Sequence, residues 1–174
     1  MFVKEEEVTY LCNAKNGRIM AEHLEISTGT KAERYELLYK QVRSVVDGEP
    51  DEIANMANVA AMIHETFGFW WTGFYRVVGD RLVLGPFQGP LACSRIAYGR
   101  GVCGTAWAEA ATQVVSDVEQ FPGHIACSSV SRSEIVVPII KSGVVTAVLD
   151  IDSEKLAAFN DTDRIWLERI VALM

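Results

Sequence analysis

Thiols and carboxylates gather in the second half of this chain. The residues concerned are Cys93, Cys103, Cys127, Glu134, Asp150 and Asp152. A thiolate can attack a soft electrophilic atom, and a nearby acid can protonate the oxygen that leaves it. A second thiol can then reduce the oxidised first one. The set therefore predicts redox chemistry on a small polar substrate, provided that the fold brings these groups together.

Size and charge limit the classes of protein to consider. The chain has 174 residues, 49% of them hydrophobic, which is enough for one domain with a core. A net charge of −7 argues against nucleic acid and against an anionic membrane surface as partners. Residues 1–12 carry acids where a signal peptide would be basic and then apolar. We expect a cytoplasmic protein.

The cysteine spacing does not favour a metal centre. The chain has four cysteines and no C-x-x-C pair, so we expect neither a zinc site nor any other bound metal. Reduced thiols are the default inside cells. For each cysteine the alternative of a small buried apolar residue stays open at this point.

Apolar periodicity predicts helices at both ends of the chain. Thr30 and Glu33 have the spacing of a capping box, and the helix that follows should end at Asp47-Gly48. A second helix should begin at Pro50 and end at Gly68. A further helix is expected over 101–111 and a last one from about residue 160. The first helix is aromatic and apolar enough to serve a homodimer.

Between the helices the pattern changes to that of strands. They are expected over 71–78, 81–87, 95–98, 113–116, 135–140 and 144–151, with a loop over 117–133. Successive hairpins flanked by helices from both chain ends predict an α+β fold with a central antiparallel sheet. We expect a single domain over 29–174, preceded by an extension over 1–28 that contains Cys12 and whose role the sequence does not reveal.

The last hairpin decides where the acids point. Asp150 and Asp152 are two apart on one strand, so both should lie on the same face. If the loop is Lys141-Ser142-Gly143, Glu134 lies opposite Asp150 on that face, whereas a two-residue turn would flip it away. The residues expected on the other face, toward the helices, are Val145, Ala147, Leu149 and Ile151.

Like charges so close together should raise the pKa of at least one carboxyl, leaving an acid that can stay protonated. Trp71 and Tyr75 share strand parity and could form an apolar wall beside the acids. A solvated strand end with ordinary acids, and an aromatic pair in the core, are the open alternatives. His124, three residues before Cys127, could assist that thiol as a base.

Gly99-Arg100-Gly101-Val102-Cys103-Gly104 fits G-x-G-x-x-G, a weak signal alone. A dinucleotide site needs a parallel βαβ unit, which this pattern lacks. We expect a tight turn that leads into the helix at Gly101.

Several segments together resemble a known family. They are GFYRV, LVLGPFQGPLACSRIAYGRGVCGTAW, VVSDV, CSSVSRSEIVVPI, VLDIDS and FNDTDRIWLE. They are similar to a GAF domain and, more narrowly, to free methionine-(R)-sulfoxide reductase, over about residues 31–174. The cysteine intervals with C-S-S-x-S-x-S-E and L-D-I-D-S are the most specific part of the likeness.

The resemblance implies a thiol enzyme that reduces free, not peptide-bound, methionine-(R)-sulfoxide. It implies Cys127 as the nucleophile, Cys93 as the resolving thiol and Cys103 as an auxiliary thiol. The resemblance also implies contacts with the substrate. The sulfoxide and amino groups would be contacted by Glu134, Asp150 and Asp152. The methyl group would be contacted by Trp71 and Tyr75. Glu134 and Asp152 would also take part in catalysis.

In the implied cycle Cys127 becomes a sulfenic acid, condenses with Cys93 and is restored by thioredoxin or a similar dithiol. No metal or organic cofactor is implied beyond an external thioredoxin and NADPH system. The alternatives are a non-catalytic GAF module that binds a small ligand, a redox sensor, and a plain interaction domain. A nucleotide phosphate would need basic groups, whereas this face offers carboxylates.

Overall fold

The computed structural model describes residues 24–125 and 129–174. Its helices are α1 (Lys31–Val46), α2 (Glu52–Phe67), α3 (Gly101–Glu109), α4 (Asp161–Val171) and the short 3-10 helix η2 (Val118–Gln120). Its strands are β1 (Trp71–Val78), β2 (Arg81–Gln88), β3 (Arg95–Ala97), β4 (Gln113–Val115), β5 (Ser133–Lys141) and β6 (Val144–Ser153).

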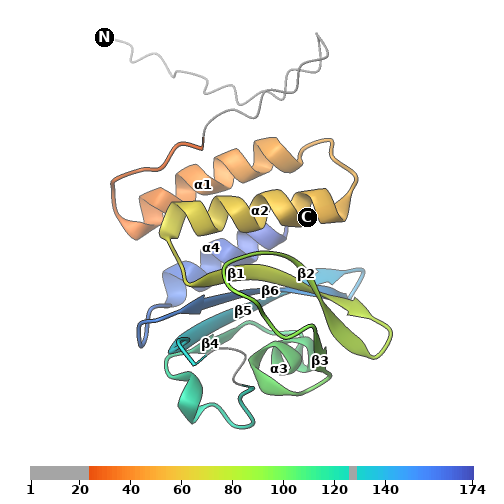
Figure 1. Cartoon of the computed structure of the whole chain (residues 1–174). Coiled ribbons are helices and arrows are strands. Elements are labelled where there is room, and N and C mark those ends of the chain that lie inside the picture. The colour runs from red at the N-terminus through yellow and green to blue at the C-terminus, as the bar shows by residue number, and fades with distance from the viewer. Residues whose placement is uncertain (1–23, 126–128) are drawn as a thin grey trace, which may run out of the picture.

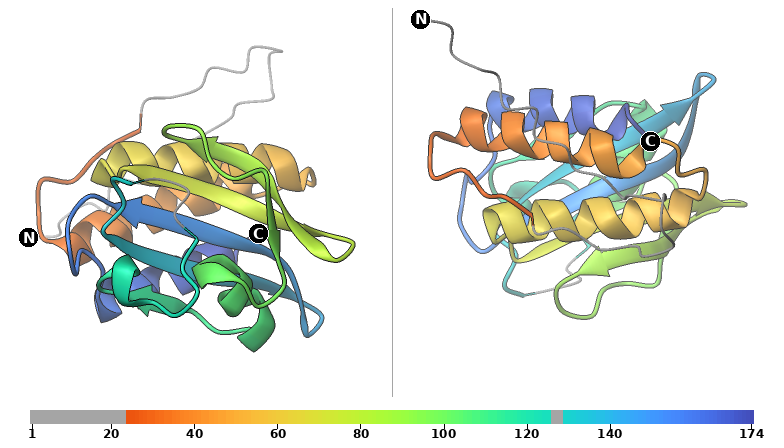
Figure 2. Two further views of the ribbon diagram at one scale, coloured as in Figure 1. Left: turned by 60° about the horizontal axis from the view of Figure 1, so that its bottom comes forward. Right: turned by 90° about the horizontal axis from the view of Figure 1, so that it is seen from above.

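The strands form one antiparallel sheet with the order β3-β2-β1-β6-β5-β4. Helices α1, α2 and α4 cover one face, and α3 lies on the other (Figure 1). Figure 2 shows both sides of this arrangement. The predicted α+β fold with a central antiparallel sheet is confirmed. Among the described residues, no helix is long and apolar enough to cross a bilayer.

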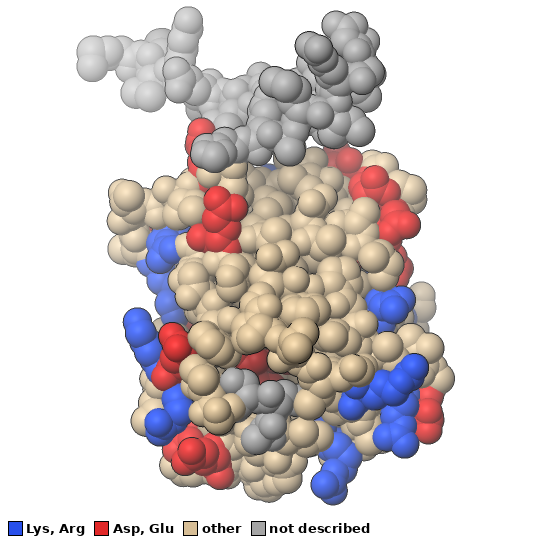
Figure 3. Space-filling view, in the orientation of Figure 1, with Lys and Arg blue, Asp and Glu red and all other residues tan. Residues whose placement is uncertain are grey.

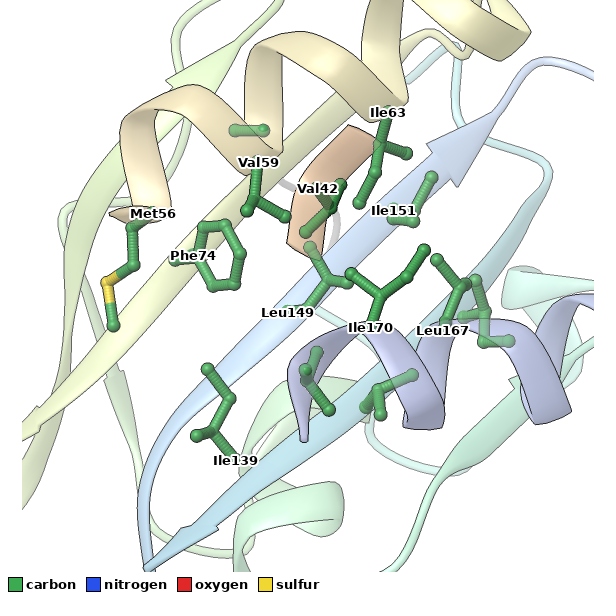
Figure 4. Packing of buried hydrophobic residues seen from close by; sticks show 14 of the residues in the cluster. Val42, Met56, Val59, Ile63, Phe74, Ile139, Leu149, Ile151, Leu167 and Ile170 are labelled. Carbon is green, nitrogen blue, oxygen red and sulfur yellow. The ribbon is translucent and has the colours of Figure 1, made fainter. Parts of the chain in front are cut away.

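Two apolar clusters occupy the two faces of the sheet. The helix-side cluster joins Phe74, Leu149 and Ile151 to residues of the three helices, among them Ile63 and Ile170 (Figure 4). All of these side chains are fully buried. The smaller cluster on the α3 side contains aromatic residues of β1 together with Cys103. The three helices bury one face of the sheet, so the α3 side is left to form a pocket.

The helix boundaries largely follow the predicted signals. The Thr30 hydroxyl accepts a hydrogen bond from the Glu33 backbone, and the Glu33 carboxylate accepts one from Thr30, as a capping box requires. The expected start at Pro50 was slightly wrong, because the Asp51 carboxylate caps α2 and the helix begins at Glu52. Most of the predicted extension, residues 1–28, lies outside the described residues, and the domain boundary at 29 stays a prediction.

The hairpin between β5 and β6 contains the feature that positions the acids. Ser142 and Gly143 both have positive φ, 52° and 79°, which is the requirement of a two-residue hairpin turn. Lys141 therefore pairs with Val144, and the predicted three-residue loop is wrong. A regular ladder from this turn would place Glu134 on the helix side, opposite Ile151.

A β-bulge in β6 turns Glu134 back to the face of the sheet opposite the helices. Ile140 pairs with Val145 but Ile139 pairs with Ala147, so Thr146 has no partner in β5. Beyond this point Glu134 pairs with Asp152, not with Asp150 as predicted. The predicted face of Glu134 is nevertheless correct. Its partner differs from the predicted one by two residues, and residues two apart on a strand lie on the same face.

Because of the bulge, Val145 points to the face opposite the one predicted. Ala147, Leu149 and Ile151 pack in the helix-side cluster as predicted, whereas Val145 belongs to the α3-side cluster. The prediction failed at Val145 because it assumed regular alternation through Thr146. The hydrophobic pattern thus overrides the ladder that the turn alone would produce.

Deletion of Thr146 should be tolerated. It removes the extra residue and leaves every pair of the ladder unchanged, so we expect a melting temperature lowered by less than about 4 °C. Differential scanning calorimetry measures this shift.

Deletion of Val148 is the matched control. The bulge can absorb that loss too, but Thr146 and Ala147 must then occupy the fully buried positions of Ala147 and Val148. We expect a loss at least about twice as large. A Thr146 deletion that unfolds the chain would contradict the role assigned to the bulge.

Candidate functional site

The acids stand in adjacent strands on the α3 side of the sheet. Glu134 of β5 pairs with Asp152 of β6, and Asp152 pairs with Trp71 of β1. In the next row, Asp150 lies opposite Gly73. Glu134 and Asp150 are buried, with exposed fractions of 7% and 6%, and Asp152 is partly buried. The structure therefore brings the three predicted carboxyls together.

Burial and mutual repulsion make two of these acids weak. Burial is the main cause that raises the pKa of Glu134 well above its usual value, and the charges of Asp150 and Asp152 add to it. The pKa of Asp150 is also raised well above its usual value, chiefly by burial and then by Asp152. The raised pKa values favour the protonated form of these carboxyls, so the site offers acids that can donate a proton.

Asp152 is the acid most easily ionised in this group. Burial raises its pKa, but the Ser131 hydroxyl donates a hydrogen bond to its Oδ1 and opposes that rise, leaving the pKa at about 6. Arg132, the next residue, donates its backbone N–H to the Ser153 carbonyl at 2.8 Å. The segment before β5 is thus fastened to the end of β6 beside Asp152.

Cys103 faces the same acids from α3. Its Sγ lies 3.9 Å from Glu134 Oε1, and the residue is 4% exposed. Burial, with the charges of Asp150 and Glu134, raises the pKa of this thiol well above its usual value. Cys103 is therefore a neutral thiol at physiological pH and a poor nucleophile. This agrees with an auxiliary role.

An aromatic wall borders the acids. The ring centroids of Trp71 and Tyr75 are 5.9 Å apart, and those of Trp71 and Phe87 are 5.4 Å apart. Trp71 Nε1 donates to the Pro90 carbonyl at 3.1 Å, which fixes the indole. Gly73 leaves room for it, because a Cβ there would lie 2.5 Å from the Trp71 ring. The predicted placement of Trp71 and Tyr75 beside the acids is confirmed.

These groups line a pocket on the α3 side. Its walls comprise Trp70, Trp71, Tyr75, Pro90, Leu91, Ala92, Ile96, Arg100, Gly101, Val102, Cys103, His124, Ile125, Ser131, Glu134, Asp150 and Asp152. Figure 3 shows acidic atoms at the bottom of a hollow in the lower half of the face drawn there. The combination of buried acids, a thiol and aromatic surface suits a small molecule with both polar and apolar parts.

The predicted thiols Cys93 and Cys103 differ in their bonding state. Cys93 follows the pocket residues Leu91 and Ala92 and is disulfide-bonded, whereas Cys103 is free. Cys127, the expected nucleophile, lies outside the described residues. His124 lines the pocket, and burial lowers its pKa, which keeps the imidazole neutral and able to accept a proton.

Sequence reasoning missed Ser131 as a functional residue. The only signal was its place in C-S-S-x-S-x-S-E, where several serines look equivalent. The glycine-rich segment behaves as predicted. Gly99 and Gly101 have φ of 68° and 61°, and the Gly99 N–H donates to the Gly104 carbonyl at 3.0 Å, which makes a tight turn into α3.

Comparisons with known proteins agree with this fold and site. The family model described as "GAF domain" matches residues 51–174. The "GAF domain-containing protein A" of Dictyostelium discoideum is 55% identical over 156 residues, which are 89% of this chain and 99% of that protein. The chain therefore belongs to the GAF domain family.

Other similar proteins are named for a reaction. The "Free methionine-R-sulfoxide reductase" of Escherichia coli is 45% identical over 143 residues, covering 82% of this chain and 87% of that one. A crystal structure of free methionine-R-sulfoxide reductase from Neisseria meningitidis in complex with its substrate is 53% identical, with a TM-score of 0.85 over 87% of this chain and 92% of that chain. The resemblance inferred from sequence is confirmed.

Glu134→Gln should stabilise the chain, and more so at higher pH. A carboxyl whose folded-state pKa is raised keeps a proton that the unfolded chain releases, so it costs stability as pH rises above its usual pKa. We expect a melting temperature higher by about 3 °C or more near pH 8 and a smaller gain near pH 4.5.

Calorimetry at both pH values tests this expectation, with Glu154→Gln at an exposed position as the control. A uniform loss of stability at both values would show that hydrogen bonds of Glu134 outweigh the cost of its burial.

Ser131→Ala should raise the pKa of Asp152 above about 6, because the hydroxyl that favours its ionised form is lost. Carbon-13 NMR of labelled aspartate side chains gives the titration midpoint directly. Ser133→Ala is the matched control, since the Ser133 hydroxyl donates to the Lys155 carbonyl at 2.6 Å. An Asp152 midpoint that does not move in Ser131→Ala would remove Ser131 from this role.

Proposed function

We propose that this protein reduces free L-methionine-(R)-sulfoxide to methionine with a thiol nucleophile. The observation that carries the proposal is the set of buried acids of unequal strength beside an aromatic wall. Relatives named free methionine-R-sulfoxide reductase, similar over most of both chains, support the same reaction.

The unequal acids fit the two polar ends of this substrate. A protonated Glu134 or Asp150 can give its proton to the sulfoxide oxygen as the bond to sulfur weakens. Asp152 is mostly ionised at neutral pH and can hold the ammonium group. Trp71 and Tyr75 offer apolar surface to the methyl group. A peptide-bound residue lacks the ammonium, which gives a physical reason for preferring the free amino acid.

The Cys127 thiolate attacks the sulfoxide sulfur, the sulfur–oxygen bond breaks with uptake of a proton, and the oxygen ends on Cys127 as a sulfenic acid. Methionine leaves. The Cys93 thiol then attacks the Cys127 sulfur, forming a disulfide and releasing water. The disulfide bonding of Cys93 supports its resolving role, and buried Cys103 is the auxiliary thiol.

An external dithiol completes the cycle. It transfers two electrons to the disulfide and is itself oxidised to a disulfide. Thioredoxin, recycled with NADPH, is the proposed reductant, and the proposal requires no metal or organic cofactor. A cytoplasmic location and a homodimer formed through α1 stay predictions.

A redox sensor is the second candidate, because a disulfide-bonded Cys93 near a pocket would also report oxidation. The two functions differ in turnover. A sensor consumes one equivalent of oxidant and stops, whereas a reductase consumes NADPH as long as sulfoxide is supplied.

The test is NADPH consumption with thioredoxin and thioredoxin reductase. We expect free methionine-(R)-sulfoxide to be reduced at least about a hundredfold faster than the free S epimer or a peptide-bound sulfoxide, because only it fits both the acids and the thiol. Equal rates of NADPH consumption with all three sulfoxides, or no NADPH consumption with any of them, would overturn the proposal.

Cysteine variants separate the two thiol roles. Cys127→Ser should abolish methionine release, whereas Cys93→Ser should release about one equivalent per chain and then stall, because the sulfenic acid cannot be resolved. Single-turnover mixing measures both. Equal activity in the two variants would remove Cys127 from its proposed role.

A further inference from the structure

We propose that Cys103, Glu134 and Asp150 together bind a divalent cation of the zinc class in this pocket. The ion would be an inhibitor that occupies the acid cluster, not a cofactor of the reaction. Binding itself does not depend on the proposed function, and only the expected inhibition does.

The geometry of these residues is close to that of a coordination site. One potential ligand atom from each residue lies within 4.8 Å of the other two, and Cys103 Sγ is 3.9 Å from Glu134 Oε1. In a tetrahedral zinc site, with the usual metal–sulfur and metal–oxygen bond lengths, such atoms lie roughly 3.3–3.8 Å apart. Small side-chain movements therefore suffice to close the site around an ion.

A second observation points to a ligand. Asp150 Oδ1 is buried without a hydrogen-bond partner, and the residue is 6% exposed and lines the pocket. A buried carboxylate oxygen normally has a donor, because burial without one costs free energy. A cation coordinated by this oxygen would satisfy it.

The described residues give the carboxyls of the cluster no salt-bridge partner. Among the salt bridges formed within residues 24–125 and 129–174, none joins a lysine or arginine to Glu134 or Asp150. A divalent ion would bring positive charge to two neighbouring acidic side chains that no basic side chain balances there. The site is therefore electrostatically prepared for a cation of charge two.

The ligand types select the metal. A thiolate with two carboxylates favours zinc or cobalt, whereas magnesium and calcium prefer sites made of oxygen alone. The adjoining cavity of about 50 Å³ leaves a fourth position open to water. An ion held there would take the acids away from the sulfoxide oxygen and so compete with substrate.

Cobalt titration tests the binding directly. The full chain with Cys12, Cys93 and Cys127 changed to serine leaves Cys103 as the only thiol. We expect a thiolate-to-cobalt charge-transfer band that saturates at about one ion per chain and that zinc abolishes. Excess magnesium should leave the band unchanged.

Acid variants in the same background locate the ligands. Glu134→Gln and Asp150→Asn should each weaken cobalt binding by about tenfold or more, because each removes a coordinating oxygen. Asp152→Asn is the matched control, because Asp152 is not part of the cluster, and it should cause a smaller loss. A band of unchanged affinity in both acid variants would mean binding by the thiol alone and would overturn the proposal.

The natural chain with its disulfide intact provides a second measurement, should the serine background fail to fold. Zinc binding by calorimetry should be lost in Cys103→Ala. Zinc should also raise the apparent KM of the reductase without lowering kcat. Binding that persists in Cys103→Ala, or no binding at all, would contradict the site, whereas binding without any reductase activity would count against the proposed function alone.

Discussion

The site depends on one geometric constraint, the parity of the β5–β6 ladder. Ser142 and Gly143 form a two-residue turn that by itself would turn Glu134 toward the helices. The unpaired Thr146 shifts the ladder by one residue, so Glu134 meets Asp152 on the α3 side and Ile135 meets Ile151 in the core. The helix-side core fixes this choice, because the alternative would bury carboxyls among Leu149 and its apolar neighbours.

The same arrangement links stability to chemistry. Burial of Glu134 and Asp150 close together costs folding free energy, and the same burial raises their pKa values and favours their protonated forms. Ser131 limits the effect at Asp152, so neighbouring carboxyls can be acid and base at once. The helix-side core offsets the cost, which explains how a domain of this size retains a cluster of buried acids.

The sequence predicted the strands, the α+β fold and the gathering of acids with Trp71 and Tyr75, because periodicity and turn residues are local signals. The position of the bulge could not be predicted, since it results from competition between turn geometry and a core formed by distant segments. Val145 was therefore assigned to the wrong face. Ser131 was missed for a related reason, because its contact with Asp152 joins residues that are far apart in the sequence.

The buried position of these acids predicts that a carboxyl of this cluster is protonated at neutral pH in the folded protein. Infrared difference spectroscopy between the natural chain and Glu134→Gln, and between the natural chain and Asp150→Asn, observes the carbonyl stretch of a protonated carboxyl directly. We expect this band to be present at neutral pH and to be lost or displaced in at least one of the two variants. A natural chain with only ionised carboxylate bands at neutral pH would contradict it.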